Sequence, residues 1–257
     1  MNILLTNDDG FDSEGIQKLA EALRLQTGHR VFVIAPDINR SGISHALSIF
    51  HSPVKLKAQG EDSWSCSGYP VDCVLIAMNG GLPVKPDLVL SGINRGSNLG
   101  TDIVYSGTAA AARQGSFYNI PSIALSLVSN GPYHWDTAVS WAIEHLEELM
   151  SYWTPNAFVN VNIPNSPTKP GAFALAWPAL KTYDDKIVEK TSSDGNRVFF
   201  LEAGKELAVK EKGSDYDVIS CNLVSVSPVY NYPAVIRELC PASPDYAAVS
   251  SRSKKKE

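Results

Sequence analysis

Residues 2–36 read NILLTNDDGFDSEGIQKLAEALRLQTGHRVFVIAP and carry the pattern from which the fold class follows. Residues 2–6 are a short apolar run that ends in a polar turn, and residues 31–35 are a β-branched run that stops at Pro36. Between them, apolar residues recur at helical spacing: Ile16, Leu19, Ala20 and Leu23. The stretch predicts a strand, a helix and a second buried strand, which together form a βαβ unit.

The same alternation continues along the chain. Further buried strands are expected at 87–91, 122–127 and 158–162. Further helices are expected at 71–78, 108–118 and 135–152. Strands that alternate with helices imply an α/β fold, a mostly parallel sheet with helices on both faces. Trp141 falls outside the main apolar stripe of its helix, and we expect it to meet another subunit.

The residue composition of the sequence changes near residue 165. We divide the chain into an α/β catalytic core at 1–165 and a β-rich elaboration at 166–257, both parts of one domain. The elaboration is rich in proline and turns, with strand-like pieces at 198–201 and 223–229. It is expected to contain a hairpin that reaches over the site or toward a neighbouring subunit. The last eight residues are expected to be a solvated tail.

The composition excludes several classes of protein. The chain has 257 residues, of which 44% are hydrophobic and 19% charged, so we expect it to fold. Its net charge of −5 provides no basic field for long nucleic acid. Four scattered cysteines form neither a disulfide framework nor a zinc motif. With neither a secretion signal nor a membrane-length apolar run visible, we expect a soluble cytoplasmic protein.

The first polar turn places two adjacent carboxylates, Asp8 and Asp9, at the carboxyl end of the first expected strand. Neighbouring carboxylates repel each other, so this arrangement costs stability unless a cation or hydrogen-bond donors offset the charge. A divalent cation is the simplest such partner. An ordinary Asp-Gly turn, with one carboxylate capping the next helix and the other in solvent, is the alternative that this motif leaves open.

Two further loops are expected at the same edge of the sheet, where ligands bind in such folds. Asn39 and Ser41 follow the second strand and would face the carboxylates, unless Ser41 only caps a helix. Residues 91–100 contain three glycines and two asparagines, and residues 106–108 open an alanine-rich helix. The N–H groups at that helix N-terminus, beside two hydroxyls, suit a phosphate, although an ordinary capped helix is the alternative.

Together the three loops offer carboxylates, hydroxyls and amide oxygens, without histidine or cysteine. Oxygen ligands of this kind suit Mg²⁺ or Mn²⁺ better than zinc. The combination predicts a metal-dependent phosphate site. The apolar runs thus give the fold class, and the polar residues at their ends give the chemistry.

Four segments resemble the motifs of the SurE survival-protein family. The members of this family are metal-dependent nucleoside-monophosphate phosphatases, also called 5′/3′-nucleotidases. The four segments occur in the family's order: ILLTNDDG at 3–10, APDINRSG at 35–42, SGINRGSNLG at 91–100 and YSGTAAAA at 105–112. A weaker match follows at 160–164. Two positions depart from the family pattern, since Tyr69 stands where threonine is usual and Asn222 where glycine is usual.

The resemblance implies a Rossmann-like α/β fold with a C-terminal hairpin and helix exchanged between subunits of a homodimer or homotetramer. It also implies one Mg²⁺ or Mn²⁺ per subunit. The implied metal ligands are Asp8, Asp9, Ser41 and Asn94. The implied phosphate-binding residues are Asn98, Ser106, Gly107 and Thr108. Asp8 or Asp9 would act as the catalytic group that orients or deprotonates the attacking water, with nucleoside 5′- and 3′-monophosphates as substrates.

Other functions fit the residues less well. A phosphatase with an aspartyl-phosphate intermediate usually has an acid two residues after its nucleophile, where Phe11 follows Asp9 here. A Mg²⁺-dependent phosphate- or nucleotide-binding regulatory module is the main alternative, but it would need a carboxylate near residues 91–94. A dinucleotide-binding oxidoreductase would need glycines in place of the two carboxylates.

Overall fold

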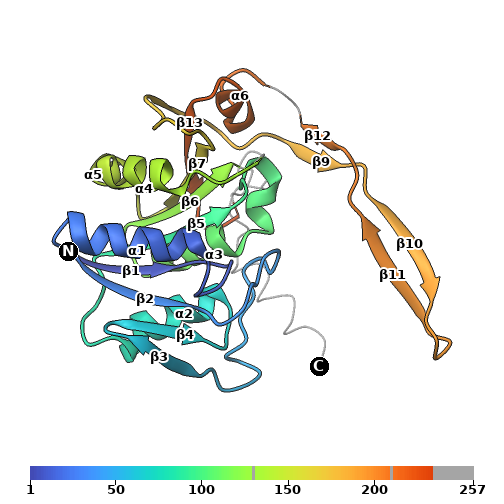
Figure 1. Cartoon of the computed structure of the whole chain (residues 1–257), viewed down its shortest axis with the longest axis horizontal. Helices are drawn as coiled ribbons and strands as arrows, with labels where there is room; N and C mark the ends of the chain where they lie inside the picture. Colours follow the sequence, from blue (N-terminus) through green and yellow to red (C-terminus); the bar gives the residue numbers. More distant parts are fainter. Residues whose placement is uncertain (129–130, 209–210, 234–257) are drawn as a thin grey trace, which may run out of the picture.

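A nine-stranded sheet forms the centre of the molecule in the computed structural model, which describes residues 1–128, 131–208 and 211–233 (Figure 1). From one edge to the other its strands are β3 (Leu56–Gly60), β4 (Ser63–Cys66), β2 (Arg30–Pro36), β1 (Asn2–Thr6), β5 (Leu88–Arg95), β6 (Ser122–Val128), β7 (Ala157–Pro164), β13 (Val224–Tyr230) and β8 (Phe173–Leu175). The strands from β4 to β7 run parallel to one another, whereas β3 runs antiparallel to β4 and β13 runs antiparallel to β7. The predicted mostly parallel α/β fold is confirmed.

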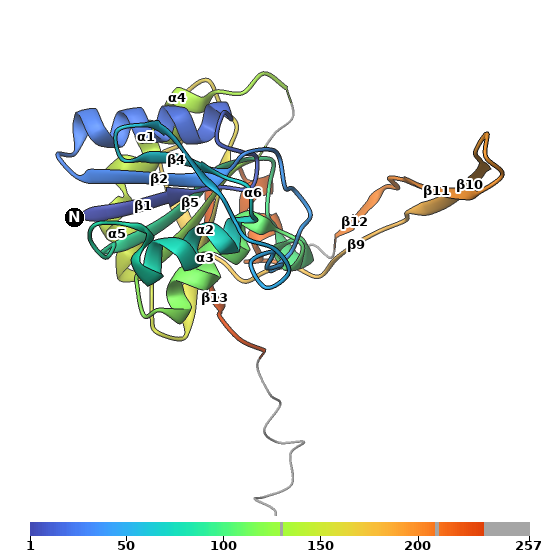
Figure 2. The ribbon, with the colours of Figure 1, turned by 90° about the horizontal axis from the view of Figure 1, so that it is seen from below.

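Helices cover both faces of the sheet. Figure 2 shows α1 and α4 on one face and α2 and α3 on the other. The helices are α1 (Glu14–Gln26), α2 (Pro70–Ile76), α3 (Gly107–Phe117), α4 (Trp135–Glu144), α5 (Leu146–Ser151) and α6 (Asp215–Ser220). A short 3₁₀ helix, η2 (Gly100–Val104), precedes α3, and a turn over Ala77–Gly81 follows α2. None of the helices in the described part of the chain is long and apolar enough to cross a membrane.

The strand order places a crevice at the carboxyl end of β1. β1 lies between β2 and β5, with Leu4 paired to Phe32 on one side and to Val89 on the other. The chain therefore leaves β1 toward one side and later returns to its other side, so the loops after these strands diverge. The sequence motifs are carried by these loops.

Several elements differ from the sequence expectations. β3 and β4 were not expected, because β3 is mostly exposed with only two apolar side chains, Leu56 and Ala58, and β4 has only four residues. The expected helix over 135–152 is divided at His145, whose Nδ1 lies 2.9 Å from the carbonyl oxygen of Trp141. The expectation for Trp141 was wrong: its side chain is fully buried, stacked on His145 and met edge-on by Phe173 of β8.

The β-rich region also contains a helix, α6, that the sequence pattern did not predict. Asn222, which follows α6, has a backbone φ of +58°, in the left-handed region. Glycine adopts this conformation most easily, and asparagine is among the residues that tolerate it. This explains how asparagine can stand where the resembling family usually has glycine.

A long hairpin projects from the body of the molecule (Figures 1 and 2). This hairpin arm consists of β10 (Lys186–Thr191) and β11 (Arg197–Glu202), and its root is the antiparallel pair of β9 (Lys181–Tyr183) and β12 (Glu206–Ala208). The arm exposes large apolar side chains: Ile187, Phe199, Phe200 and Leu201. The C-terminal segment expected to exchange with another subunit, and the polar tail, lie outside the described residues.

Candidate active site

The turn after β1 holds the two carboxylates in place. Asn7 is fully buried, and its side-chain nitrogen donates to the carbonyl oxygen of Gly10 at 2.9 Å and to Ser13 Oγ at 2.7 Å. Its side-chain oxygen accepts the Gly10 N–H at 3.3 Å. Hydrogen bonds within the turn therefore fix its shape, while the carboxylates of Asp8 and Asp9 accept hydrogen bonds from other elements.

Asp8 is 3% exposed and lies against the first turn of α3. Its Oδ1 accepts a hydrogen bond from Thr108 Oγ1 at 2.5 Å. A Cβ atom on Gly107 would lie 2.8 Å from Asp8 Cβ and 2.9 Å from Asp8 Oδ2, so only glycine permits this approach. Burial raises the pKa of Asp8, while hydrogen bonds from Thr108 and from the backbone N–H groups that open α3 oppose the rise. Asp8 thus occupies much of the helix N-terminus that the sequence assigned to phosphate.

Asp9 is held by the end of β5. Its Oδ2 accepts the backbone N–H of Arg95 at 2.7 Å. Burial raises the pKa of Asp9 to about 6; the Arg95 N–H opposes this shift, and the charge of Asp8 adds to it. Within the described ranges neither carboxylate forms an ion pair. A buried acid beside a half-buried one, neither of them in an ion pair, is the arrangement that a bound cation would stabilise.

The loop after β2 passes beside Asp8. The Arg40 N–H donates to the carbonyl oxygen of Asp8 at 2.7 Å. Ser41 is the next residue in the chain after this contact. Asn39 accepts the Ser41 N–H at 2.7 Å and lines, with Asp9 and Arg95, a cavity of about 250 Å³. The loop after β2 is therefore bound to the main chain of the acidic turn, whereas Ser41 itself is exposed and its approach to the two carboxylates stays a prediction.

Asn94 lies on β5 itself, although the expected strand ended at 91. Pairing with β6 is interrupted after Ser91 and resumes where Asn94 meets Ser126, so the strand continues to Arg95. Asn94 is 8% exposed, and its side-chain nitrogen donates to the carbonyl oxygen of Gly96 at 2.9 Å. This bond uses the amide nitrogen and leaves the amide oxygen as the atom suited to a metal.

Asn98 is bound by the ends of β6 and β7. Its backbone N–H donates to Asn162 Oδ1 and its side-chain nitrogen to Ser126 Oγ, both at 2.8 Å. Its carbonyl oxygen accepts from the side chains of Asn160 and Asn162. The sequence analysis missed Ser126, Asn160 and Asn162 as supports, although two asparagines in a fully buried strand are a signal that could have found them.

Ser106 begins α3. Its Oγ accepts the Ala109 N–H at 3.0 Å, so this hydroxyl caps the helix. His45 lies on the outer side of the same helix, with its Nε2 2.9 Å from Gln114 Oε1, and burial lowers its pKa. Of the two neighbouring hydroxyls predicted to bind phosphate, Ser106 thus caps the helix and Thr108 donates to Asp8.

The donor set fits a hard divalent cation. No group of three or more His, Cys, Asp or Glu side chains suited to a metal occurs in the described part of the chain. A metal at this edge would therefore need neutral oxygens beside Asp8 and Asp9, and Ser41 and Asn94 offer them. Mg²⁺ and Mn²⁺ accept such mixed oxygen ligands and keep several waters.

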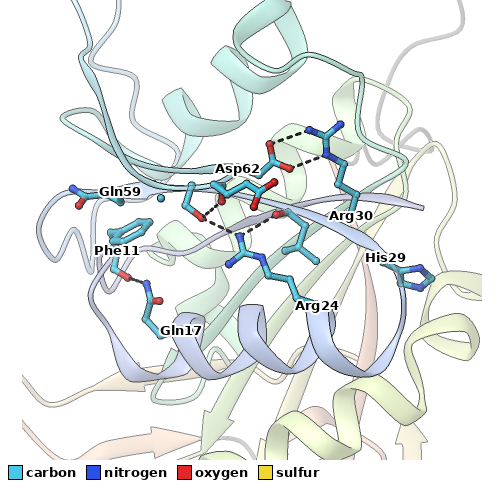
Figure 3. A pocket seen from close by; sticks show the side chains of 11 residues that line it. Phe11, Gln17, Arg24, His29, Arg30, Gln59 and Asp62 are labelled. Carbon is cyan, nitrogen blue, oxygen red and sulfur yellow. Dashed lines mark hydrogen bonds and ion pairs between the residues drawn. The ribbon is translucent and has the colours of Figure 1, made fainter.

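A larger hollow of about 470 Å³ lies between α1 and the turn from β3 to β4 (Figure 3). Its arginines are engaged within the protein: Arg30 pairs with Asp62 at 2.7 Å, and Arg24 donates to the carbonyl oxygen of Val31 and to Ser63 Oγ. These cations are not free to receive a phosphate, so we place the functional site at the carboxyl end of β1.

Replacing Thr108 by valine is expected to lower the free energy of unfolding by about 1–3 kcal/mol, because a buried carboxylate loses a hydroxyl donor while the shape is kept. Urea denaturation at neutral pH measures the change. Thr108→Ser keeps the hydroxyl and is the matched control. If the serine variant lost as much stability as the valine variant, the methyl group and not the hydrogen bond to Asp8 would be responsible.

Comparison with known proteins places these motifs in one family. The family model described as survival protein SurE matches residues 3–183. Curated relatives named 5′-nucleotidase SurE include one from Stenotrophomonas maltophilia (strain R551-3), 37% identical over 89% of each chain. Another, from Synechococcus elongatus, is 39% identical over 89% of this chain and 93% of its own. The crystal structure of a SurE protein from Aquifex aeolicus matches over 100% of both chains, with a TM-score of 0.77 and 31% identity.

Proposed function

The chain belongs to the SurE survival-protein family and is a 5′-nucleotidase, and we propose that it uses a divalent metal ion to hydrolyse nucleoside 5′- and 3′-monophosphates. The observation that carries the proposal is the neighbouring pair of a buried Asp8 and a half-buried Asp9, which form no ion pair in the described part of the chain, with Asp8 against the N-terminus of α3. The products would be the nucleoside and inorganic phosphate.

We assign the metal ligands as Asp8, Asp9, Ser41 and Asn94, with one Mg²⁺ or Mn²⁺ per subunit. A bound ion of this kind supplies a Lewis acid that polarises a phosphate oxygen and lowers the pKa of a coordinated water. The assignment is supported by the oxygen-only donor set and by the contacts that bring the three loops together.

The two carboxylates have different surroundings, and we propose different roles for them. Asp8 is the more buried of the two and accepts a hydrogen bond from Thr108 Oγ1, so its carboxylate is held in one position. The contact of Asp9 with the Arg95 N–H uses Oδ2, which leaves Oδ1 to orient the attacking water and accept its proton.

The start of α3 would stabilise the phosphate. We propose that Ser106, Gly107 and Thr108 act on the equatorial oxygens through the positive end of the α3 dipole, since the Ser106 hydroxyl caps the helix and the Thr108 hydroxyl is bound to Asp8. Asn98, bound by β6 and β7, fixes the loop that leads into this helix. Tyr105 is 64% exposed beside Ser106, and we propose that its ring packs against the base of the nucleotide.

The arm supports an assembly with other copies of the chain. Its apolar side chains, Ile187, Phe199, Phe200 and Leu201, are 48–65% exposed, which is costly for a free surface. We infer a homodimer or homotetramer in which the arm packs on a second copy. The cytoplasmic location expected from the sequence stays a prediction.

Phosphate release from a panel of nucleoside 5′- and 3′-monophosphates tests the proposed function. The protein is first stripped with a chelator, then assayed before and after Mg²⁺ or Mn²⁺ is restored. Release that depends on the metal is the expected result and ranks the substrates. A folded, metal-loaded protein that released phosphate from none of them would favour the alternative of a nucleotide-binding regulatory module.

Added Mg²⁺ or Mn²⁺ is expected to raise the Tm of the stripped protein more at about pH 7.5 than at about pH 5. The pKa of Asp9 in the folded chain, about 6, exceeds its ordinary value of 3.8, so the stripped protein loses stability as pH rises through this interval. The metal offsets that loss only where Asp9 is ionised. At a metal concentration about 100 times Kd, a rise of roughly 5–10 °C is expected at the higher pH. Equal rises at both pH values, measured by calorimetry, would argue against ligation by Asp9.

A further inference from the structure

A cluster of charged side chains joins the root of the arm to the segment in front of α3. We call residues 98–106 the phosphate-side loop, since they lie between Asn98 and Ser106. Lys181, the first residue of β9, has a side chain that is only 4% exposed. Its ammonium lies 2.6 Å from Asp102 Oδ2, in η2, and 3.1 Å from Glu206 Oε2, in β12. One buried cation therefore binds two acids, one from the loop and one from the arm root.

Asp102 connects this cluster to the start of α3. Its carboxylate accepts the ammonium of Lys181 and the hydroxyl of Tyr183, the latter at 2.8 Å. Its backbone carbonyl oxygen accepts the N–H groups of Tyr105 and Ser106, at 3.0 and 3.1 Å. The side chain of Asp102 thus binds the arm root, while its main chain fixes the residue that caps α3.

A second buried acid fastens the other end of the same loop. Asp215, fully buried in α6, accepts the Gly100 N–H at 2.7 Å and the Ala179 N–H at 2.8 Å. A Cβ atom on Gly100 would lie 2.2 Å from the carbonyl oxygen of Ala179, so the two segments are in direct contact. Thr101 also donates to the carbonyl oxygen of Lys181. The loop and the approach to the arm are therefore one continuous unit.

We propose that Lys181 is a positioning residue for phosphate hydrolysis: by holding Asp102 it sets the phosphate-side loop, and through Ser106 it sets the N-terminus of α3. This role of Lys181 rests on the proposed function, in which the start of α3 stabilises the phosphate. Without the ammonium, Asp102 and Glu206 would face each other as partly buried acids with no cation between them, and Asp102 would move away. A displacement of about 1 Å at a catalytic group costs on the order of 100-fold in rate.

The test uses Lys181→Met in the full-length protein, with Arg197→Met as the matched control. Arg197 pairs with Glu189 on the exposed part of the arm, at 2.6 Å, so the control removes the same charge from the same hairpin, away from its root. Two quantities are measured in each variant: hydrogen exchange of the backbone amides at 100–106, and kcat and KM for a nucleoside 5′-monophosphate with Mg²⁺.

Lys181→Met is expected to speed exchange at Tyr105 and Ser106 and to lower kcat by about 10- to 100-fold, with a smaller change in KM. Lys181→Arg, which retains a cation for both acids, is expected to restore most of kcat. The control is expected to match the wild type in exchange at 100–106 and in kcat. Unchanged exchange, or faster exchange with unchanged kcat, would overturn the proposal. An equal loss in Arg197→Met would overturn it too, because the effect would belong to the arm as a whole.

Tyr183→Phe tests the proposed role of Asp102 and the arm root if Lys181→Met does not fold. It removes only the hydroxyl that donates to Asp102. It is expected to speed exchange at Tyr105 and Ser106 and to lower kcat, both by less than Lys181→Met does. Normal exchange in this variant would overturn the proposal. Hydrogen exchange also separates two kinds of failure: a wild type without phosphatase activity refutes the proposed function, whereas exchange that does not respond to Lys181 refutes the coupling.

Discussion

Asp9→Asn is expected to lower kcat for phosphate release by about 100- to 1,000-fold at saturating Mg²⁺, because one charged group is lost at the reacting centre. Asparagine has nearly the same shape, and its oxygen can still accept the Arg95 N–H. It cannot accept the proton of the attacking water, and it contributes no negative charge to the metal. The fold is expected to persist, because the substitution removes a half-buried carboxylate whose ionisation the stripped protein disfavours.

Asp136→Asn is the matched control for this experiment. Its carboxylate is 85% exposed and pairs with Lys18 on the surface, so the same change of charge is made away from the site. Asp8→Asn is expected to lose turnover as well, since Asp8 is the second proposed ligand from the same turn. Near wild-type kcat in Asp9→Asn or Asp8→Asn at saturating metal would show that the ligand assignment is wrong.

Gly107→Ala is expected to lower kcat/KM by about 10- to 100-fold through a single added methyl group. That methyl would lie 2.8 Å from Asp8 Cβ and 3.2 Å from Ile43 Cγ2, so Asp8 or the start of α3 must shift. Alanine is favoured over glycine in a helix by roughly 1 kcal/mol, which offsets part of the strain. The variant should therefore lose activity without a matching loss of stability.

Activity and urea denaturation of Gly107→Ala, measured side by side, check this expectation. Gly171→Ala is the control, because a Cβ atom there would meet nothing within 4 Å and the backbone is not left-handed. A Gly107→Ala variant that kept its activity would mean that Asp8 tolerates displacement. A variant that unfolded would mean that the contact serves stability and not placement of the carboxylate.

The parts of the fold predicted from the sequence are those with a clear period or a clear end. The run at 2–6, the helix that includes Ile16 and the run at 31–35 follow from burial and spacing, and they recur as β1, α1 and β2. β3 could not be found in this way, since this mostly exposed edge strand has only two apolar side chains, Leu56 and Ala58. The break at His145 was hidden because the apolar spacing continues on both sides of it.

At the site, the sequence predicted where the acids lie but not what binds them. Asp8 and Asp9 stand at a strand end, a position that topology alone makes significant. The partner of Asp9 is a backbone N–H, which no residue type reveals, and it is in place only because β5 resumes its pairing after an irregularity. Thr108 was assigned to phosphate, whereas its hydroxyl donates to Asp8; only the placement of the start of α3 beside the turn after β1 shows this.

The acidic turn and its supports come from distant parts of the chain, which has a consequence for the kinetics of folding. Asp8 and Thr108 are separated by 100 positions, and Asp9 and Arg95 by 86. Closing such large loops costs conformational entropy before the contacts repay it, so these groups meet late in folding. A cation that needs the assembled turn would find no partner earlier. It would extend the lifetime of the folded protein without shortening the time the chain needs to reach that state.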